Sequence, residues 1–190
     1  MDTLQNRFEA SVQRLGLNDL PCAVFYTAPF GIRFEIGGNE DIYLGDHRKP
    51  NGAYIENAVD RALKIYARLP VAPDILMIDD CPGISIPGLP QPDQQTGDSS
   101  YWSIPKEPAF LRKLFREIVK AEIDPDGMGE LVSHVYLLDS SNHVLFHLYD
   151  DRGADVVAPE KEILRPLYEA CSDWILEYDR EKIDRLFHSS

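Results

Sequence analysis

The sequence is short of the features that mark secreted and membrane proteins. Its 190 residues include three cysteines, Cys22, Cys81 and Cys171, which lie far apart and form neither a CxxC pair nor a disulfide framework. An odd number of dispersed cysteines suits a reducing compartment. No apolar run approaches the roughly 18–20 residues of a membrane span, and the first residues lack the basic start and apolar stretch of a signal peptide. The sequence therefore predicts a cytoplasmic protein with no membrane partner.

Basic residues are also scarce. Lys and Arg number 19 against 32 Asp and Glu, so the formal charge is −13. Such a field repels a phosphate backbone, and the sequence shows no local basic patch, so nucleic-acid binding is disfavoured. The same field attracts a basic protein and speeds its association. A basic protein is therefore the predicted class of partner.

Motifs for nucleotide binding and nucleophilic catalysis are missing as well. The chain contains no GxxxxGK[ST], no GxGxxG and no GxSxG. Cys171 falls on the apolar face of a predicted helix, where a small buried residue is the usual case. We therefore predict no cofactor, no resident metal and no catalytic residues.

The hydrophobic pattern predicts one α+β domain over residues 1–190. Helical spacing occurs in residues 2–15, 51–70, 109–123 and 159–187. Alternating or short apolar runs predict strands at residues 22–29, 31–38, 74–80, 131–139, 143–151 and 154–158. The last three strands form an antiparallel meander near the C-terminal end, and the amphipathic helices pack against it.

The closing segment predicts one main helix that starts or kinks at Pro166. Trp174 shares a helical stripe with Leu167, Cys171, Ile175 and Tyr178. Its ring is therefore predicted to pack against the meander, as a buried aromatic side chain.

Residues 81–108 form a Pro- and Gly-rich stretch without a sustained period, which predicts a surface loop. Tyr101 and Trp102 are adjacent aromatics in this loop and are our candidate binding residues, because aromatic anchors dominate many interfaces. An alternative fits equally well, in which Trp102 folds back as a lid on the core.

Two histidines suggest a metal site on the predicted hairpin. A loop at residues 139–142 places His134 directly opposite His147, close enough to share a metal with Asp150 or Asp155 as a third ligand. Half-buried sheet histidines fit the same alternation without any metal, and we favour that interpretation.

Asp79 and Asp80 end the apolar run at residues 74–78, where two carboxylates suit Mg²⁺. Solvation of a strand end explains them equally simply. In the DDRG stretch, Asp150 or Asp151 is predicted to cap a solvated turn, followed by Arg152 and by Gly153 at a positive φ.

The C-terminal third resembles a known family. The segments LYDDRGADVVA (148–158) and LRPLYEACSDWILEYDREKIDRLF (164–187) are similar to the closing part of a bacterial family of uncharacterised proteins, a domain of unknown function. RALKIYARL and the strand after it resemble the middle of that family. The resemblance implies a bacterial cytoplasmic α+β protein and brings no activity, cofactor or catalytic residue.

Two function hypotheses follow. The first is a non-enzymatic, acidic binding protein, such as an immunity protein that neutralises a basic toxin. The alternative is a metal-assisted hydrolase that uses Asp79, Asp80, His134 or His147.

Overall fold

The computed structural model describes residues 3–21, 23–45, 49–79, 86, 89–104, 108–124, 126 and 134–188. The helices are α1 (Leu4–Arg14), α2 (Val24–Thr27), α3 (Gly52–Tyr66), α4 (Pro108–Lys120), α5 (Lys161–Ala170), η2 (Ser172–Trp174), η3 (Glu177–Asp179) and α6 (Arg180–His188). The strands are β1 (Phe30–Glu35), β2 (Tyr43–Leu44), β3 (Lys49–Pro50), β4 (Ile75–Ile78), β5 (Gln94–Thr96), β6 (Ser99–Ser103), β7 (Val135–Asp139), β8 (Val144–Leu148) and β9 (Gly153–Ala158).

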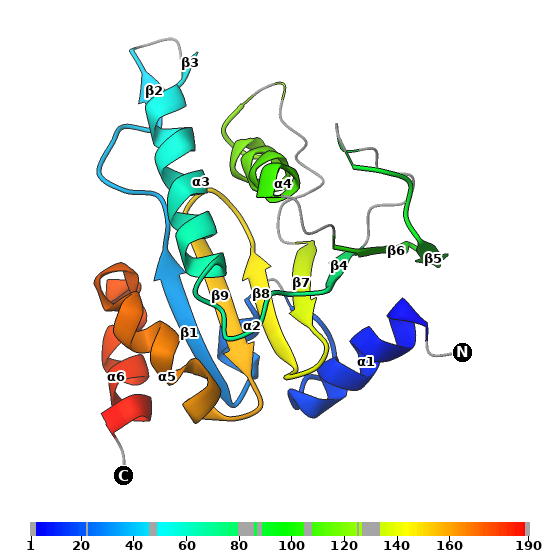
Figure 1. Cartoon of the computed structure of the whole chain (residues 1–190). Helices are drawn as coiled ribbons and strands as arrows, with labels where there is room; N and C mark the ends of the chain where they lie inside the picture. The colour runs from blue at the N-terminus through cyan, green and yellow to red at the C-terminus, as the bar shows by residue number, and fades with distance from the viewer. Residues whose placement is uncertain are drawn as a thin grey trace.

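A seven-stranded sheet carries the fold. Its strand order is β1-β9-β8-β7-β4-β6-β5, and every neighbouring pair is antiparallel. The predicted meander is its centre, as β7, β8 and β9. The helices lie around this sheet, with α3 and α4 on one side and α5 and α6 beside β1 (Figure 1). The predicted α+β class is confirmed.

Both faces of the sheet are buried, and successive strand side chains point alternately into the two cores. Leu137, Phe146 and Val156 face the larger core, which α3 and α4 cover. Leu138 and Leu145 face a smaller core under α1. The ring of Phe115 from α4 stacks on that of Phe146, with centroids 5.7 Å apart. Among the described helices, none is both long and apolar enough to cross a membrane.

The segment predicted as a strand at residues 22–29 is wrong where the structure describes it. Residues 24–27 form the single turn α2, closed by the Ala28 N–H donating to the Val24 carbonyl at 2.9 Å. A short apolar run fits a buried helical turn as well as a strand, so periodicity does not separate them. Cys22 lies outside the described residues.

The predicted loop at residues 81–108 contains a β-hairpin. β5 and β6 pair around a tight turn in which Gly97 takes a φ of +58°. β6 also pairs with β4, so this hairpin extends the main sheet. Its strands are short and partly polar, and the sequence pattern therefore gave no sustained period. Residues 80–85, including Asp80 and Cys81, lie outside the described part of the chain.

The closing segment is broken into α5, two 3₁₀ turns and α6, so the single helix predicted there is wrong. Pro166 lies inside α5 and neither starts nor ends it. Between the helices the chain runs beside β1, where the Leu176 N–H donates to the Arg33 carbonyl at 2.9 Å. This contact covers part of an exposed sheet edge, which would otherwise offer unpaired backbone groups.

Trp174 is consequently only half-buried, and its partner on the predicted stripe, Tyr178, is 85% exposed. Trp174→Ala is expected to lower the free energy of unfolding by about 2 kcal/mol, less than the roughly 3–5 kcal/mol of a fully buried aromatic, because part of the ring already meets water. Tyr178→Ala is the control and should stay within about 0.5 kcal/mol of the parent. Denaturant unfolding measures both, and a Trp174→Ala loss in the fully buried range would contradict the observed packing.

Candidate functional site

The two histidines do not face each other, and the predicted pairing is wrong. His147 is opposite Tyr136, because β7 ends at Asp139 and pairs it with Val144. The turn therefore occupies residues 140–143, with His143 closing it at a φ of +56°. The Asp139 carboxylate caps this turn by accepting the Ser141 N–H at 2.9 Å. The register differs from the prediction by two residues, which leaves every side chain on its predicted face but changes its partner.

His147 belongs to a buried row that crosses four strands on the α1 side. In this row Arg33 pairs with Asp155, Asp155 with His147, and His147 with Tyr136. The imidazole is fully buried and stacks on the Tyr136 ring, with centroids 4.4 Å apart. The favoured interpretation, a histidine of an ordinary sheet, therefore describes His147, which is fully buried and not half-buried as expected.

Asp155 is the acid of this row, and the pKa of its carboxyl group is strongly shifted. Burial raises the pKa of its carboxyl group to about 7, against a smaller opposing effect of the Arg33 guanidinium. The Nε of Arg33 lies 3.2 Å from one carboxylate oxygen, and the Phe25 N–H donates to the other at 3.1 Å. Arg33 also donates to the Tyr149 hydroxyl at 3.1 Å. This cluster holds β1, β9 and α2 together, and its carboxylate has no exposed surface.

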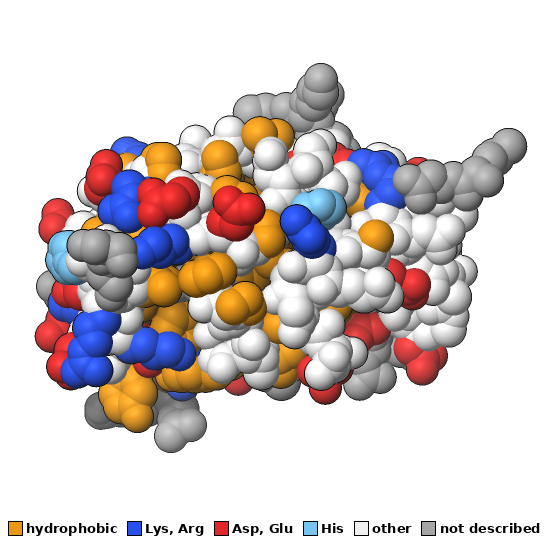
Figure 2. Space-filling view, turned by 90° about the horizontal axis from the view of Figure 1, so that it is seen from below, with side chains coloured by type: hydrophobic (Ala, Val, Ile, Leu, Met, Phe, Trp, Pro, Cys, Tyr) orange, Lys and Arg blue, Asp and Glu red, His pale blue; other side chains and the backbone are white. Residues whose placement is uncertain are grey.

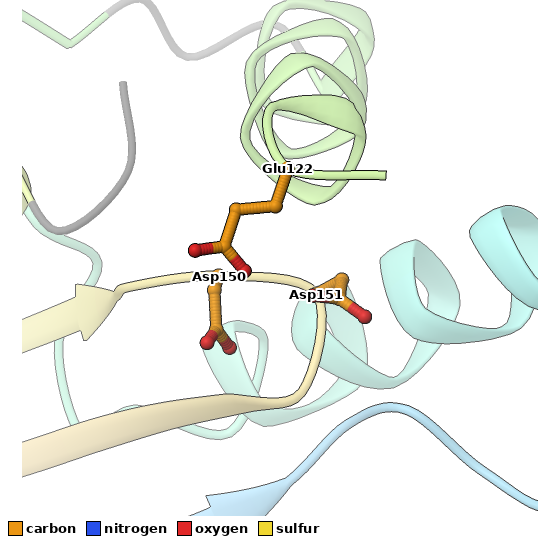
Figure 3. Close-up of side chains that lie close together, drawn as sticks. All are labelled: Glu122, Asp150 and Asp151. Atoms are coloured by element: carbon orange, nitrogen blue, oxygen red, sulfur yellow. The ribbon is translucent and has the colours of Figure 1, made fainter. Parts of the chain in front are cut away.

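A second group of acids lies at the β8–β9 turn. Glu122, Asp150 and Asp151 are the one set of three potential metal ligands that the described residues bring within 4.8 Å of one another. It contains neither His134 nor His147, so the predicted pairing of histidines in a metal site is not formed. Figure 3 shows Glu122 reaching toward the turn while Asp150 and Asp151 point in different directions.

Both aspartates of this turn are occupied by protein partners. Asp150 accepts the N–H groups of Arg152 and Gly153 at 2.8 and 3.1 Å, so its predicted capping role is confirmed. Asp151 accepts the Tyr54 hydroxyl at 2.6 Å. Burial raises the pKa of Asp151, which the Tyr54 hydrogen bond partly opposes. Both aspartates are buried while Arg152 is exposed, so the turn is solvated only in part, which corrects the expectation of a solvated turn.

Gly153 is required for a different reason than the one predicted. The positive φ values among the described glycines are at other positions, so a left-handed turn does not explain this residue. A Cβ at Gly153 would overlap the Tyr149 hydroxyl and lie 3.0 Å from the Phe34 carbonyl oxygen. Close packing of β9 against these groups therefore excludes a side chain.

The strongest candidate site is a cleft beneath α1, which we call the α1 cleft. It has a volume of about 360 Å³ and lies between α1, the segment at residues 17–20, β4 and β6. The residues that line it are Phe8, Glu9, Val12, Gln13, Leu17, Asn18, Asp19, Leu20, Met77, Asp79, Ser99 and Tyr101. Its charged lining residues, within the described part of the chain, are all acids.

The floor and the rim of the α1 cleft differ in chemistry. Phe8, Met77 and Tyr101 are buried and form an apolar floor, with the Phe8 and Tyr101 rings edge to face at 6.0 Å. Glu9 and Asp19 are exposed at the rim. Burial raises the pKa of Tyr101, the Ser99 hydroxyl opposes this, and the Glu9 and Asp79 carboxylates raise it further. The hydroxyl of Tyr101 therefore lies in the negative field of the rim.

Asp79 is half-buried just after β4, where it accepts the Ser99 hydroxyl at 2.5 Å. Its backbone N–H donates to the His134 carbonyl at 3.0 Å, so Asp79 and His134 are neighbours at the ends of the adjacent strands β4 and β7. His147 is opposite Tyr136, which lies two residues after His134 along the chain, so His147 is not beside Asp79. Of the four residues of the hydrolase hypothesis, Asp79 lines the α1 cleft, and Asp80 is outside the described residues.

The two candidate aromatics are not exposed anchors, which corrects that expectation. Tyr101 and Trp102 are 4% and 3% exposed, because strand alternation sends them into the two opposite cores. The Trp102 indole N–H donates to the Pro90 carbonyl at 2.9 Å, as expected for a lid on the core. Tyr101 nevertheless forms part of the buried floor of the α1 cleft.

Sequence reasoning missed Glu9 and Asp19. Glu9 is the polar neighbour of the buried Phe8 on α1, and Asp19 follows the helix in an irregular segment. Both look like ordinary solvated acids in the sequence. Glu9 and Asp19 line the same cleft as Asp79 because α1 and the segment after it pack against β4 and β6.

Comparisons with known proteins agree with the resemblance seen in the sequence. A family model described as "Domain of unknown function (DUF3885)" matches residues 6–85 and 79–179. The "Uncharacterized protein YnaE" of Bacillus subtilis (strain 168) is 41% identical over 44 residues, which are 23% of this chain and 21% of that protein. The chain thus matches about a fifth of the length of that relative. No solved structure matches the chain.

Proposed function

The chain belongs to the family described as a domain of unknown function (DUF3885), and from the chemistry of its surface we propose that it is a cytoplasmic binding protein for a basic protein. The α1 cleft is the site that receives this partner. Neutralisation of a basic toxin, as by an immunity protein, is the biological role that we propose for such binding.

The overall charge supports the class of partner. A formal charge of −13 attracts a cationic protein over distances of about the Debye length, roughly 8 Å at physiological ionic strength. Complementary charge mainly raises the association rate and rejects acidic competitors. Affinity then requires a place where the partner loses water, and the α1 cleft supplies one.

The α1 cleft is the observation that carries the proposal. A Lys or Arg side chain has an apolar stem and a charged head. The stem matches a floor of Phe8 and Met77. The head matches the exposed carboxylates of Glu9 and Asp19 at the rim and the half-buried carboxylate of Asp79 beside them. The guanidinium or ammonium group also suits the negative face of the Tyr101 ring. A long basic side chain therefore satisfies both surfaces of the cleft at once.

Affinity capture from cells of the native host tests the proposal. The bait is the full chain, either unchanged or as Glu9→Gln/Asp19→Asn/Asp79→Asn, in which each substitution removes one charge and keeps the shape. The unchanged chain is expected to recover a basic protein, and the cleft variant should recover at least about tenfold less, since three carboxylates are lost.

A second triple variant, Glu160→Gln/Glu169→Gln/Asp173→Asn, controls for net charge. It removes the same three charges from exposed positions around α5. Recovery should stay close to that of the unchanged chain. Equal loss in both variants would mean that net charge alone acts, and equal recovery by the cleft variant would place the partner elsewhere. Both outcomes contradict the proposed site.

A further inference from the structure

A second hollow lies beside β1, at the other edge of the sheet from β6 and β5. It has a volume of about 280 Å³ and is formed by α2, the start of β1 and α6. Its lining residues are Phe25, Ala28, Pro29, Gly31, Lys182, Ile183, Arg185 and Leu186. Figure 2 looks at the molecule from below and shows Lys and Arg side chains gathered around a hydrophobic patch on the side where α5 and α6 lie.

The charge of this hollow is opposite to that of the α1 cleft. Its charged lining residues, among those that the structure describes, are Lys182 and Arg185. Lys182 forms no ion pair with a described residue, and its ammonium lies 4.2 Å from the centroid of the Phe25 ring. Arg185 pairs with Glu181 one turn earlier on α6.

Helix capping and the helix dipole account for the nearby cations, including Arg185 in the last turn of α6, but not for Lys182. Lys161 and Arg165 on α5 donate to the Leu186 and Phe187 carbonyls, each at 3.3 Å, near the end of α6. Cations at a helix C-terminus satisfy its free carbonyl groups and its dipole. Lys182 is near the start of α6, where the dipole disfavours a cation, and its ammonium is instead held over the Phe25 and Tyr26 rings, 4.2 and 5.2 Å from their centroids.

We propose that this hollow binds a small amphipathic carboxylate, a molecule with an apolar body and one anionic head. The apolar body packs against Phe25, Ile183 and Leu186. The carboxylate meets the ammonium of Lys182 and the guanidinium of Arg185. This site is separate from the α1 cleft, and the proposal does not depend on the basic protein partner.

Size and charge decide the class of ligand. Pockets for drug-sized ligands occupy roughly 300–1,000 Å³, so a hollow of about 280 Å³ suits a smaller molecule. The negative field of the whole chain repels anions. An anion therefore binds only where local cations outweigh that field, and an apolar body adds the affinity that two exposed cations lack.

The test uses 4-phenylbutyrate as a probe and the full chain labelled with ¹⁵N. Two-dimensional NMR should show saturable shifts of backbone amides in α2, the start of β1 and α6, with a Kd on the order of 1 mM for a ligand of this size. The neutral isostere 4-phenylbutyramide should bind about tenfold more weakly, because it lacks the charge. Equal binding of the amide, or shifts that do not saturate or lie elsewhere, would overturn the proposal.

Variants separate the two parts of the site. Lys182→Gln/Arg185→Gln should weaken binding of 4-phenylbutyrate about tenfold. Ala28→Leu places a larger side chain in the hollow and should abolish the shifts while the rest of the spectrum shows a folded chain. Lys64→Gln/Lys113→Gln removes the same charge from α3 and α4 and should bind like the parent. Unchanged binding in either hollow variant rules out this site.

Discussion

Arg33→Met is expected to lower the free energy of unfolding by about 3–5 kcal/mol at pH 8, the cost of leaving one partner of a buried ion pair uncompensated. The side chain of Arg33 is 13% exposed and that of Asp155 is fully buried. Methionine fills a similar volume but removes the cation 3.2 Å from the carboxylate. Asp155 must then take up a proton, which is costly at a pH well above its unfolded pKa.

The cost should shrink as the pH falls, because Asp155 is then protonated in both chains. Denaturant unfolding at pH 8 and pH 5 measures the two differences in stability. Arg112→Met is the matched control, since Arg112 makes exposed ion pairs with Glu56 and Asp60 and should contribute about 1 kcal/mol or less. A penalty for Arg33→Met that is as small as the control at pH 8 would contradict the role of this pair.

Asp155→Asn should change how stability depends on pH. The pKa of Asp155 is raised from its ordinary value of 3.8 to about 7 in the folded chain, first because of burial. The folded state therefore binds more protons than the unfolded state between about pH 4 and pH 7. Stability from this group is present below that window and is lost as the pH rises through it.

The amide of Asn cannot titrate, so the variant lacks this loss. Relative to Asp155→Asn, the unchanged chain should lose about 4 kcal/mol from pH 4 to pH 8, since each pKa unit corresponds to about 1.4 kcal/mol. Free energies of unfolding for both chains across this range test the prediction. Parallel profiles would show that Asp155 titrates near its ordinary pKa, and the account of its burial would be wrong.

The elements with strong periodicity could be predicted from the sequence. The α3 stripe, the β4 run and the three strands of the meander are all where the pattern places them. The pairing of His147 could not be predicted, because the turn occupies residues 140–143 instead of the expected 139–142. His143 closes this turn in a left-handed conformation, and moving the turn by one residue shifts the partner of His147 by two. Alternation fixes the face of a side chain, and turn geometry fixes its partner.

The candidate site was the hardest part to predict, for a physical reason. The α1 cleft combines a helix flank, an irregular segment and two strands that are distant in sequence. Asp79 and Tyr101 are recognisable from their local sequence, but the alternating pattern of β6 is short and predicts a loop in place of the hairpin. Burial of Tyr101 follows from its pairing with Met77 of β4, which no local pattern indicates.

The proposed role of the α1 cleft is tested most directly by the rate constants for binding of the captured partner. Association with the unchanged chain should slow about tenfold between low and high salt, because screening weakens the attraction of the acidic surface. Glu9→Gln/Asp79→Asn should also speed dissociation about tenfold, as expected when desolvated charges at the contact are lost. The matched variant Glu169→Gln/Asp173→Asn should leave dissociation unchanged. Equal dissociation rates for all three chains would contradict the proposal that a basic side chain occupies the cleft.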